Sequence, residues 1–466
     1  MKRLIVGIVI LVGIVLLVLG GMRLMDILKP LHIQKIGLHY LPENRLRLKV
    51  EVLLNKSADA RIKYWQLGGQ DTLYTESSAG QAKHTLVMYN LIATKKYKYQ
   101  IEVVKGREKY SSKIYPFQTK SIYQTTPYFA LDSLDASSSD IESKFFLTQI
   151  LTQPGAAVIL NGAGEMVWYE SFAKGVKVSS WTPDQTVLCV LGSEDIPSSG
   201  GDEIVEINRK GEYVKHFKLG EAGMDKMVHH EVRKDAKGNI YSITFDKKVV
   251  DLTSVGGSKN DTVKADGIVI FDPEGKKIWE WSFLDHIDIL KYPNIMKNKK
   301  DLVHANSLFD DGKGSFLMSF RDLNQVWKID RKTGKVIWKF GENGDFQLDK
   351  AHYFYAQHWV HINPRGELQL LDNGTKTKQS RTLSFALDEQ KKTAQSRIAI
   401  PYPKEFHSTV KGNSMLLDKD RMLVCLTDPR LFLITDFAGK LLWKMSIGGD
   451  PYRIEEIQGF KNVAHE

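Results

Sequence analysis

Three histidines recur at matching places in the second part of the chain. Each is followed eight positions later by a glycine and then by an apolar, strand-like run; the pairs are His230 with Gly238, His304 with Gly312, and His358 with Gly366. If the three histidines lie on the same strand of successive repeats, a ring of such repeats brings their imidazoles to one rim of a central channel. Loops and strand ends would form a pocket there.

Three converging imidazoles have three interpretations. They could bind a metal ion, since histidine is the commonest ligand of zinc and copper. They could hold an oxyanion, with one imidazole as nucleophile and the others as protonated donors. They could also be ordinary buried histidines whose nitrogens are satisfied by neighbouring groups.

Two further residues favour the oxyanion. Arg321 follows the apolar run 316–320 in the same repeat as His304. A guanidinium binds tetrahedral oxyanions through paired hydrogen bonds and repels a metal cation. Asn306 lies two positions after His304, so both side chains leave an extended strand on the same side, where the amide could orient an imidazole or donate to an oxygen.

The repeats that must position these residues contain a second motif, Gly-x-x-x-Trp. With 36 Gly and 9 Trp in 466 residues, chance predicts roughly 0.7 such pairs. Four copies occur, a fifth has lost its Trp, and a sixth unit is degenerate near Leu387-Asp388-Glu389; the glycines are Gly164, Gly211, Gly275, Gly334 and Gly439. Each copy is typical of a hairpin turn followed by a Trp that covers the sheet beneath. Six strand-rich units predict an all-β fold, a six-bladed β-propeller over residues 145–466.

The preceding residues predict a second β domain. Residues 33–120 alternate apolar and polar side chains in the manner of half-buried strands, which predicts a small β-sandwich. Leu91 lies six positions before Tyr97, a spacing that resembles the tyrosine corner of fibronectin type III domains, in which the hydroxyl ties the loop to the following strand. Residues 121–144, rich in Ser, Thr and Asp, are typical of a linker.

The amino-terminal segment predicts a transmembrane helix. Residues 4–22 are nineteen positions without a charge, which at about 1.5 Å per residue nearly span the ~30 Å hydrocarbon layer. Lys2 and Arg3 favour a cytoplasmic amino end, so the body would lie on the extracytoplasmic side. The apolar run is long for a secretory signal and no small-x-small site follows it, which favours an uncleaved signal-anchor.

Composition excludes other classes. The formal net charge is +10, but the basic residues are scattered through turns and form no basic helix or zinc finger, so we expect no nucleic-acid partner. The two cysteines, Cys189 and Cys425, lie far apart in apolar runs. They exclude a disulfide framework and a Cys-rich metal site, and buried thiols are expected.

The ordered motifs around the histidines resemble the bacterial arylsulfate sulfotransferases. These motifs are His229-His230-Glu231, His304-Ala305-Asn306-Ser307, Ser319-Phe320-Arg321, Gln357-His358 and Leu371-Asp372-Asn373-Gly374. Enzymes of that family have a β-sandwich before a six-bladed propeller and move a sulfuryl group between phenols without a nucleotide sulfate donor. The resemblance covers roughly residues 33–450. This chain has Glu231 and Trp359 where the family more often has Asp.

The resemblance implies a role for each candidate residue. His358 would be the nucleophile that becomes transiently sulfated, in a ping-pong reaction. The sulfate oxygens would be held by His230, His304 and Arg321, with Asn306 and His229 as further substrate-binding candidates. The eight-residue spacing selects His230, rather than His229, as the histidine that faces the site. The substrates would be a small aryl sulfate donor and a phenolic acceptor, with no cofactor and no metal.

Two other functions fit parts of the sequence. Residues 330–338 also resemble the tryptophan-docking repeat of pyrroloquinoline quinone propellers, although those dehydrogenases commonly have eight blades, a calcium site and adjacent cysteines. A non-catalytic, membrane-anchored propeller that binds a glycan or protein partner would have purely structural histidines. The sequence is compatible with a homo-oligomer.

Overall fold

The computed structural model describes residues 29–460, except residues 70, 123–128, 198 and 222. The chain divides into two compact units, one ending at Ile122 and one ending at Phe460. Within the described ranges no helix has the length and apolar character needed to cross a membrane. The transmembrane helix predicted for residues 4–22 lies outside those ranges and stays a prediction.

The first unit consists of seven antiparallel strands. They are β1 (Ile33–Tyr40), β2 (Leu48–Gln66), β3 (Thr72–Tyr74), β4 (Ser78–Met88), β5 (Lys96–Lys105), β6 (Glu108–Ser111) and β7 (Tyr115–Gln118). The first part of β2 pairs with β1 and β4, and its second part pairs with β3 and β5. Alternate residues of β2 and β5 are buried in one shared core, as the alternation predicted.

The predicted tyrosine contact is present in this unit. The backbone N–H of Ile92 donates to Tyr97 Oη at 2.9 Å, just before β5 begins. The hydroxyl therefore ties the preceding loop to the strand. The likeness of the whole unit to a fibronectin type III domain stays a prediction.

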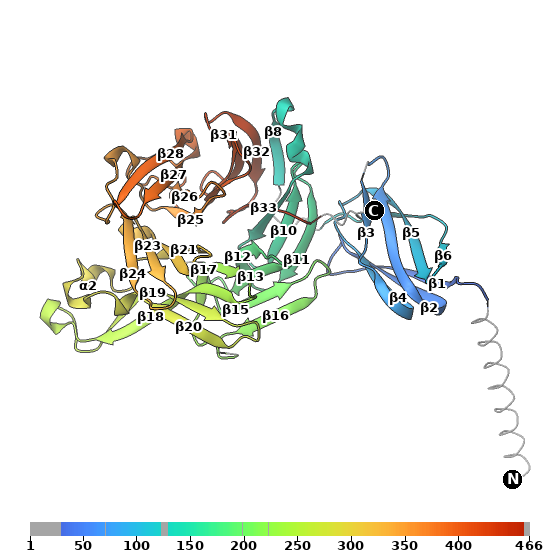
Figure 1. Ribbon diagram of the computed structural model, residues 1–466, viewed down its shortest axis with the longest axis horizontal. Coiled ribbons are helices and arrows are strands. Elements are labelled where there is room, and N and C mark those ends of the chain that lie inside the picture. The colour runs from blue at the N-terminus through green and yellow to red at the C-terminus, as the bar shows by residue number, and fades with distance from the viewer. Residues whose placement is uncertain (1–28, 70, 123–128, 198, 222, 461–466) are drawn as a thin grey trace, which may run out of the picture. The chain divides into compact units, whose positions relative to one another are not determined.

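The second unit is an all-β, six-bladed propeller, as the repeats predicted (Figure 1). In the order of the chain, its sheets consist of β9 (Phe145–Ile150), β10 (Gly155–Asn161) and β11 (Met166–Phe172) with β33 (Glu455–Ile457); β12 (Gly175–Trp181), β13 (Val187–Gly192), β15 (Glu203–Ile207) and β16 (Tyr213–Lys218); β14 (Gly200–Gly201), β17 (Val228–Lys234), β18 (Ile240–Val250), β19 (Asp261–Phe271) and β20 (Lys277–Ser282); β21 (Ala305–Asp310), β22 (Ser315–Phe320), β23 (Gln325–Asp330) and β24 (Val336–Gly341); β25 (His358–Ile362), β26 (Leu368–Asp372), β27 (Arg381–Asp388) and β28 (Thr393–Pro401); and β29 (Asn413–Leu416), β30 (Arg421–Leu426), β31 (Leu431–Asp436) and β32 (Leu441–Ile447) with β8 (Phe129–Leu134).

Short helical turns lie in the connections. They are η1 (Ala136–Ser143), η2 (Thr253–Val255), η3 (Phe283–Asp285), η4 (Ile289–Lys291), α2 (Ile295–Asn298), η5 (Arg321–Leu323), η6 (Lys350–His352) and η7 (Lys404–Phe406). The segment 121–144, predicted to be a linker, contains η1 and β8, and β8 pairs with β32 of the last blade. Residues 129–134 therefore extend a propeller sheet rather than forming a free connection.

The repeated Gly-x-x-x-Trp motif, which lacks its Trp after Gly211, forms the outer hairpin of five blades. All five of its glycines have φ between 70° and 89°, a left-handed backbone that favours glycine in such turns. In the degenerate unit Lys392 takes this place with φ of 55°. The Trp side chains connect successive blades: the indole N–H of Trp443 donates to Gly162 O, and that of Trp168 donates to Arg209 O.

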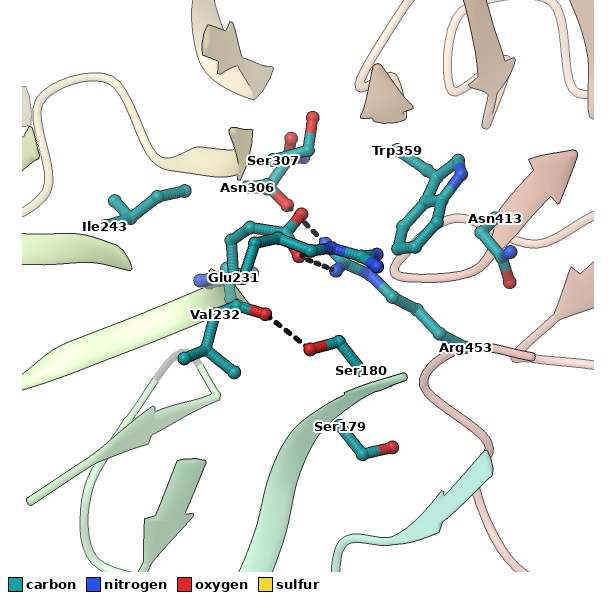
Figure 2. Close-up of polar contacts among 12 residues, drawn as sticks. Ser179, Ser180, Glu231, Val232, Ile243, Asn306, Ser307, Trp359, Asn413 and Arg453 are labelled. Atoms are coloured by element: carbon teal, nitrogen blue, oxygen red, sulfur yellow. Dashed lines mark hydrogen bonds and ion pairs between the residues drawn. The ribbon is translucent and has the colours of Figure 1, made fainter. Parts of the chain in front are cut away.

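The two ends of the propeller chain close the ring in the first and last blades. Strand β33, close to the end of the described chain, pairs with β9 at the inner edge of the first blade. Just before it, the side chain of Arg453 is 2 % exposed. Its Nη1 donates to Glu231 Oε1 at 2.8 Å and its Nη2 donates to Asn306 O at 3.0 Å. Arg453 therefore connects residues 453–457, the closing segment, to the inner strands β17 and β21 (Figure 2).

Two cations contact the ring of Trp359 in the same region. The guanidinium carbon of Arg453 is 4.3 Å from the ring centroid of Trp359, and that of Arg233 is 4.6 Å from it. Arg233 in turn donates to both carboxylate oxygens of Glu455. The centre of the propeller thus contains one network of charged side chains around the indole ring of Trp359. Its members come from β17, β25 and the closing segment.

We predict that this set stabilises the closed ring. Arg453→Met leaves the buried Glu231 with only the more distant Arg233, so the free energy of unfolding should fall by about 3 kcal/mol. Urea unfolding followed by tryptophan fluorescence measures this, because eight of the nine Trp residues lie in the propeller. The double variant Arg453→Met/Glu231→Met removes both charges and should recover part of the loss. A loss below about 0.5 kcal/mol in Arg453→Met would contradict the prediction.

Candidate active site

The three predicted histidines lie at the starts of three neighbouring inner strands. His230 is the third residue of β17, His304 directly precedes β21, and His358 begins β25. Each strand has a bulge at this point, since the pairing register shifts between His229 and Val232, between Ala305 and Ser307, and between His358 and His361. A bulge bends a strand and redirects its side chains. The repeat thus places the three imidazoles at one rim, as predicted.

The backbone at these bulges is strained. His230 has φ of 58°, His304 has φ of 48° and Trp359 has φ of 55°, all in the left-handed region that non-glycine residues rarely adopt. The N–H of Val360 donates to Ser307 Oγ at 2.8 Å, which holds the bulge of β25 against β21. Strain of this kind persists only where the surrounding contacts determine the conformation.

The imidazoles of His230 and His304 are in contact. Their ring centroids are 5.1 Å apart at an interplanar angle of 76°. Burial lowers the pKa of His230 well below its ordinary value, and the charges of His229, His304, His358 and Arg453 act in the same direction. These groups therefore lie within electrostatic reach of one another.

His358 is held in one tautomer. Asn373 Nδ2 donates to the carbonyls of Ser408 and Lys411, so its Oδ1 must accept from His358 Nδ1–H at 2.7 Å. The proton of a neutral ring is then on Nδ1, and Nε2 carries a lone pair. The backbone N–H of Lys411 donates to this Nε2 at 3.2 Å.

The same surroundings keep His358 neutral. Burial, together with the charges of Arg321 and His304, lowers its pKa to about 3 against the opposing hydrogen bond with Asn373. His358 is 3 % exposed. A buried imidazole with an unprotonated Nε2 is the form that can act as a nucleophile.

His304 and Arg321 each pair with an aspartate. His304 Nδ1 lies 2.6 Å from Asp301 Oδ2, and Arg321 Nε donates to Asp322 Oδ1 at 2.7 Å. Burial by itself would raise the pKa of Asp301, but the hydrogen bond and charge of His304, together with the charge of Arg321, bring that pKa below its ordinary value. Within the described chain, no hydrogen bond uses the two Nη groups of Arg321. They are free to donate to a bound oxyanion.

Asn306 supports the site from behind. Its side chain is fully buried, and its Nδ2 donates to the carbonyl of Gln357 at 2.7 Å. That carbonyl belongs to the peptide that precedes His358. The amide nitrogen of Asn306 therefore positions β25.

His229 lies behind His230. Its Nδ1 is 2.7 Å from His230 Nδ1, its Nε2 is 3.1 Å from Asp266 Oδ1, and its ring stacks on Phe245 with centroids 4.0 Å apart. Phe245 and Asp266 face each other on β18 and β19. Nδ1 of His229 thus makes a hydrogen bond, whereas its Nε2 is beside the Asp266 carboxylate without hydrogen-bond geometry.

A cavity of about 1050 Å³ borders the carboxylates of Asp266 and Asp301. Phe245, Asp266 and Asp301 are among the residues that line it. Part of its wall is apolar, with Met227, Trp281 and Leu284. The cavity therefore reaches the groups that partner His229 and His304.

Four contributors to the site were not identified from the sequence. Asp266 and Asp301 gave no motif, although Asp301 lies only three positions before His304. Asn373 lies within a quoted motif without an assigned role, and Arg453 lies far along the chain from all of its partners. Across the described ranges, no group of three or more His, Cys, Asp or Glu side chains is arranged to hold a metal ion.

Comparison with protein families decides the relationship. The family model described as arylsulfotransferase (ASST) matches residues 192–448, more than half of the chain. The chain belongs to the arylsulfotransferase family. The range shared with that family contains all the histidines of the site together with Arg321 and Asn306, whereas Arg453 and Glu455 lie beyond it.

Solved structures and curated sequences add less than the arylsulfotransferase match. A protein of unknown function from Bacteroides caccae is 12% identical, with 68% of this chain and 99% of that chain covered and a TM-score of 0.43. Virginiamycin B lyase from Staphylococcus aureus is 10% identical, with 68% and 99% covered and a TM-score of 0.34. Likenesses this distant carry no argument about this chain. No curated protein sequence matches it.

We predict that His358 stays neutral from pH 5 to pH 8, because burial holds its pKa near 3. The unfolded chain binds this proton below about pH 6.5, so stability should fall as the pH drops from 6.5 towards 3. Between pH 6.5 and 5 the contribution is about 2 kcal/mol, and His358→Gln should remove it. Urea unfolding at several pH values measures this change, and imidazole NMR of the folded protein follows the ring directly. A His358 midpoint above pH 6 would contradict the prediction.

Proposed function

We propose that this protein is a nucleotide-independent sulfotransferase that moves a sulfuryl group from an aryl sulfate to a phenol through a sulfohistidine at His358. The observation that carries the proposal is the neutral imidazole of His358, whose tautomer is fixed by Asn373 and whose Nε2 carries a lone pair. Membership of the arylsulfotransferase family supports the reaction class.

The first half-reaction uses this lone pair. His358 Nε2 gives up its hydrogen bond from the N–H of Lys411 and bonds to sulfur as the bond from sulfur to the aryl oxygen breaks. The electron pair of the broken bond leaves with the phenolate. Asn373 Oδ1 accepts from Nδ1–H and stabilises the positive charge that develops on the ring. Since the nucleophile is already unprotonated, no base is needed to activate it.

Hydrogen-bond donors balance the charge on the other side of sulfur. The Nη groups of Arg321 and the imidazoles of His304 and His230 would hold the three sulfuryl oxygens and the departing phenolate. Asp301 supports a positive charge on His304 through the 2.6 Å contact at Nδ1. The phenolate takes up a proton from these donors. In the second half-reaction an acceptor phenol returns a proton as its oxygen attacks sulfur, so His358 is regenerated.

The sequence alone supports the proposed location. The apolar segment 4–22 would anchor the protein with its body on the extracytoplasmic side. Small aryl sulfates and phenols would be its partners there.

Turnover of 4-nitrophenyl sulfate with phenol as acceptor tests the proposal. His358→Ala should lose activity by roughly 10³-fold or more, because the covalent route is removed. His361→Ala is the matched control: His361 is a half-buried histidine three residues along β25, and its Nδ1 forms a hydrogen bond with the carbonyl of Trp359. This control should stay close to the unmodified protein.

Trapping the intermediate makes the test specific. With donor and no acceptor, mass spectrometry should find a sulfated peptide that contains His358. Full activity in His358→Ala, or sulfation at another residue, would end the assignment of the nucleophile. Absence of turnover with any aryl sulfate would favour a non-catalytic propeller.

A further inference from the structure

The side chains of Asp266, His229 and His230 contact one another in series beside the proposed sulfuryl site. Asp266 Oδ1 lies 3.1 Å from His229 Nε2, and His229 Nδ1 lies 2.7 Å from His230 Nδ1. The other ring nitrogen of His230, Nε2, is on the opposite edge of its ring from His229. His229 and Asp266 are 1 % and 3 % exposed, so water does not compete for these contacts.

The carboxylate is fixed between two blades. Asp266 Oδ2 accepts from the backbone N–H of Ala305 at 2.7 Å, which holds the other oxygen towards His229. Phe245, opposite Asp266 on β18, covers the face of the His229 ring. His229 therefore has little freedom to turn, and Asp266 is the anionic group beside its Nε2.

The short distance between the two Nδ1 atoms requires a proton between them. Two facing lone pairs would repel, so one of the rings donates. If His230 donates, its neutral ring has a lone pair at Nε2 and repels an anionic oxygen. If His229 donates, a neutral His230 has its proton at Nε2 and can donate to that oxygen.

Asp266 decides between these arrangements. Asp266 Oδ1 lies 3.1 Å from His229 Nε2 without hydrogen-bond geometry, but its negative charge repels a lone pair on that nitrogen and favours a proton there. His229 can then also donate from Nδ1 only as a cation. A buried carboxylate in contact with the ring favours that cation. The surroundings of His230 oppose a second positive charge on His230 itself, since His304, His358 and Arg453 all face it.

We propose that Asp266 and His229 form a positioning pair that keeps the proton of His230 on Nε2, where it donates to a sulfuryl oxygen. His229 then acts through His230 and does not contact the substrate, in contrast to the role expected for it from the sequence. This inference rests on the proposed function of the site.

The charged groups around the pair are known. His229 faces Asp266 from β19 and feels Asp301 from the connection before β21. His230 faces His304 from the same connection, His358 from β25 and Arg453 from the closing segment. Among these groups only Asp266 contacts His229 with a negative charge, so it is the group to change.

Asp266→Asn tests the pair in the full-length protein. The amide keeps the acceptor for Ala305 but removes the charge that favours cationic His229. The kcat/KM for 4-nitrophenyl sulfate should fall about 10- to 100-fold at neutral pH. The alkaline limb of its pH profile should move to lower pH, because the proton is held less tightly. A purely structural loss would leave the shape of the profile unchanged and would overturn the proposal.

Asp246→Asn is the matched control. Asp246 is also a buried carboxylate on the β18–β19 hairpin, but it pairs with Lys226 at 2.6 Å and with no histidine. Its variant should keep the pH profile of the unmodified protein. A shift equal to that of Asp266→Asn would assign the effect to the hairpin and would contradict the proposal.

Imidazole ¹⁵N NMR without substrate separates this inference from the proposed function. The unmodified protein should show His230 protonated at Nε2 and a proton shared between His229 and His230. Asp266→Asn should lose the shared proton at a lower pH than the unmodified protein does. If the protein turns over no aryl sulfate but gives this spectrum, the proposed function fails and the pair stands. A neutral His230 protonated at Nδ1 would overturn the pair.

Discussion

The buried guanidinium of Arg453 is the contact on which the propeller and its site both depend. A charge this deep must be paired, and its partners, Glu231 and the carbonyl of Asn306, belong to the inner strands that carry His230 and His304. The backbone around it is fixed as well: Thr148 Oγ1 donates to Arg453 O, and Tyr452 Oη donates to His230 O. Closing the ring and holding the histidines in place are therefore one event, although Arg453 lies beyond the range that matches the family.

The site gives similar imidazoles different properties through their partners. An amide oxygen holds the proton of His358 on Nδ1, whereas carboxylates hold His304 and His229. In a dry interior such hydrogen bonds and charges are barely screened, so each contact has a large effect on where a proton resides. A buried imidazole and the guanidinium of Arg321 can then lie within electrostatic reach of one another, because the neutral ring of His358 avoids the cost of burying a second charge.

The fold was largely predictable, and part of the site was not. The left-handed turn of each Gly-x-x-x-Trp hairpin is a local requirement, so the repeat appears in the sequence and its count predicts six blades. The equal spacing of His230, His304 and His358 from their glycines likewise reflects equivalent positions in the blades. Asn306 and His229 were expected at the substrate, yet Asn306 Nδ2 donates to Gln357 O and His229 Nδ1 contacts His230 Nδ1. Spacing predicts the strand on which a residue lies but not the partner of its side chain.

The sequence by itself determined the repeat, the number of blades, the rim at which the histidines gather and the family to which the chain is related, because all of these follow from local turns and from residue order. Only the tertiary structure decided which carboxylate or amide contacts each imidazole, and hence that the proton of His358 lies on Nδ1. Those contacts join residues far apart in the chain, such as His358 with Asn373 and Lys411, and His230 with Tyr452. They arise only when the ring closes and water is excluded, which no local pattern records.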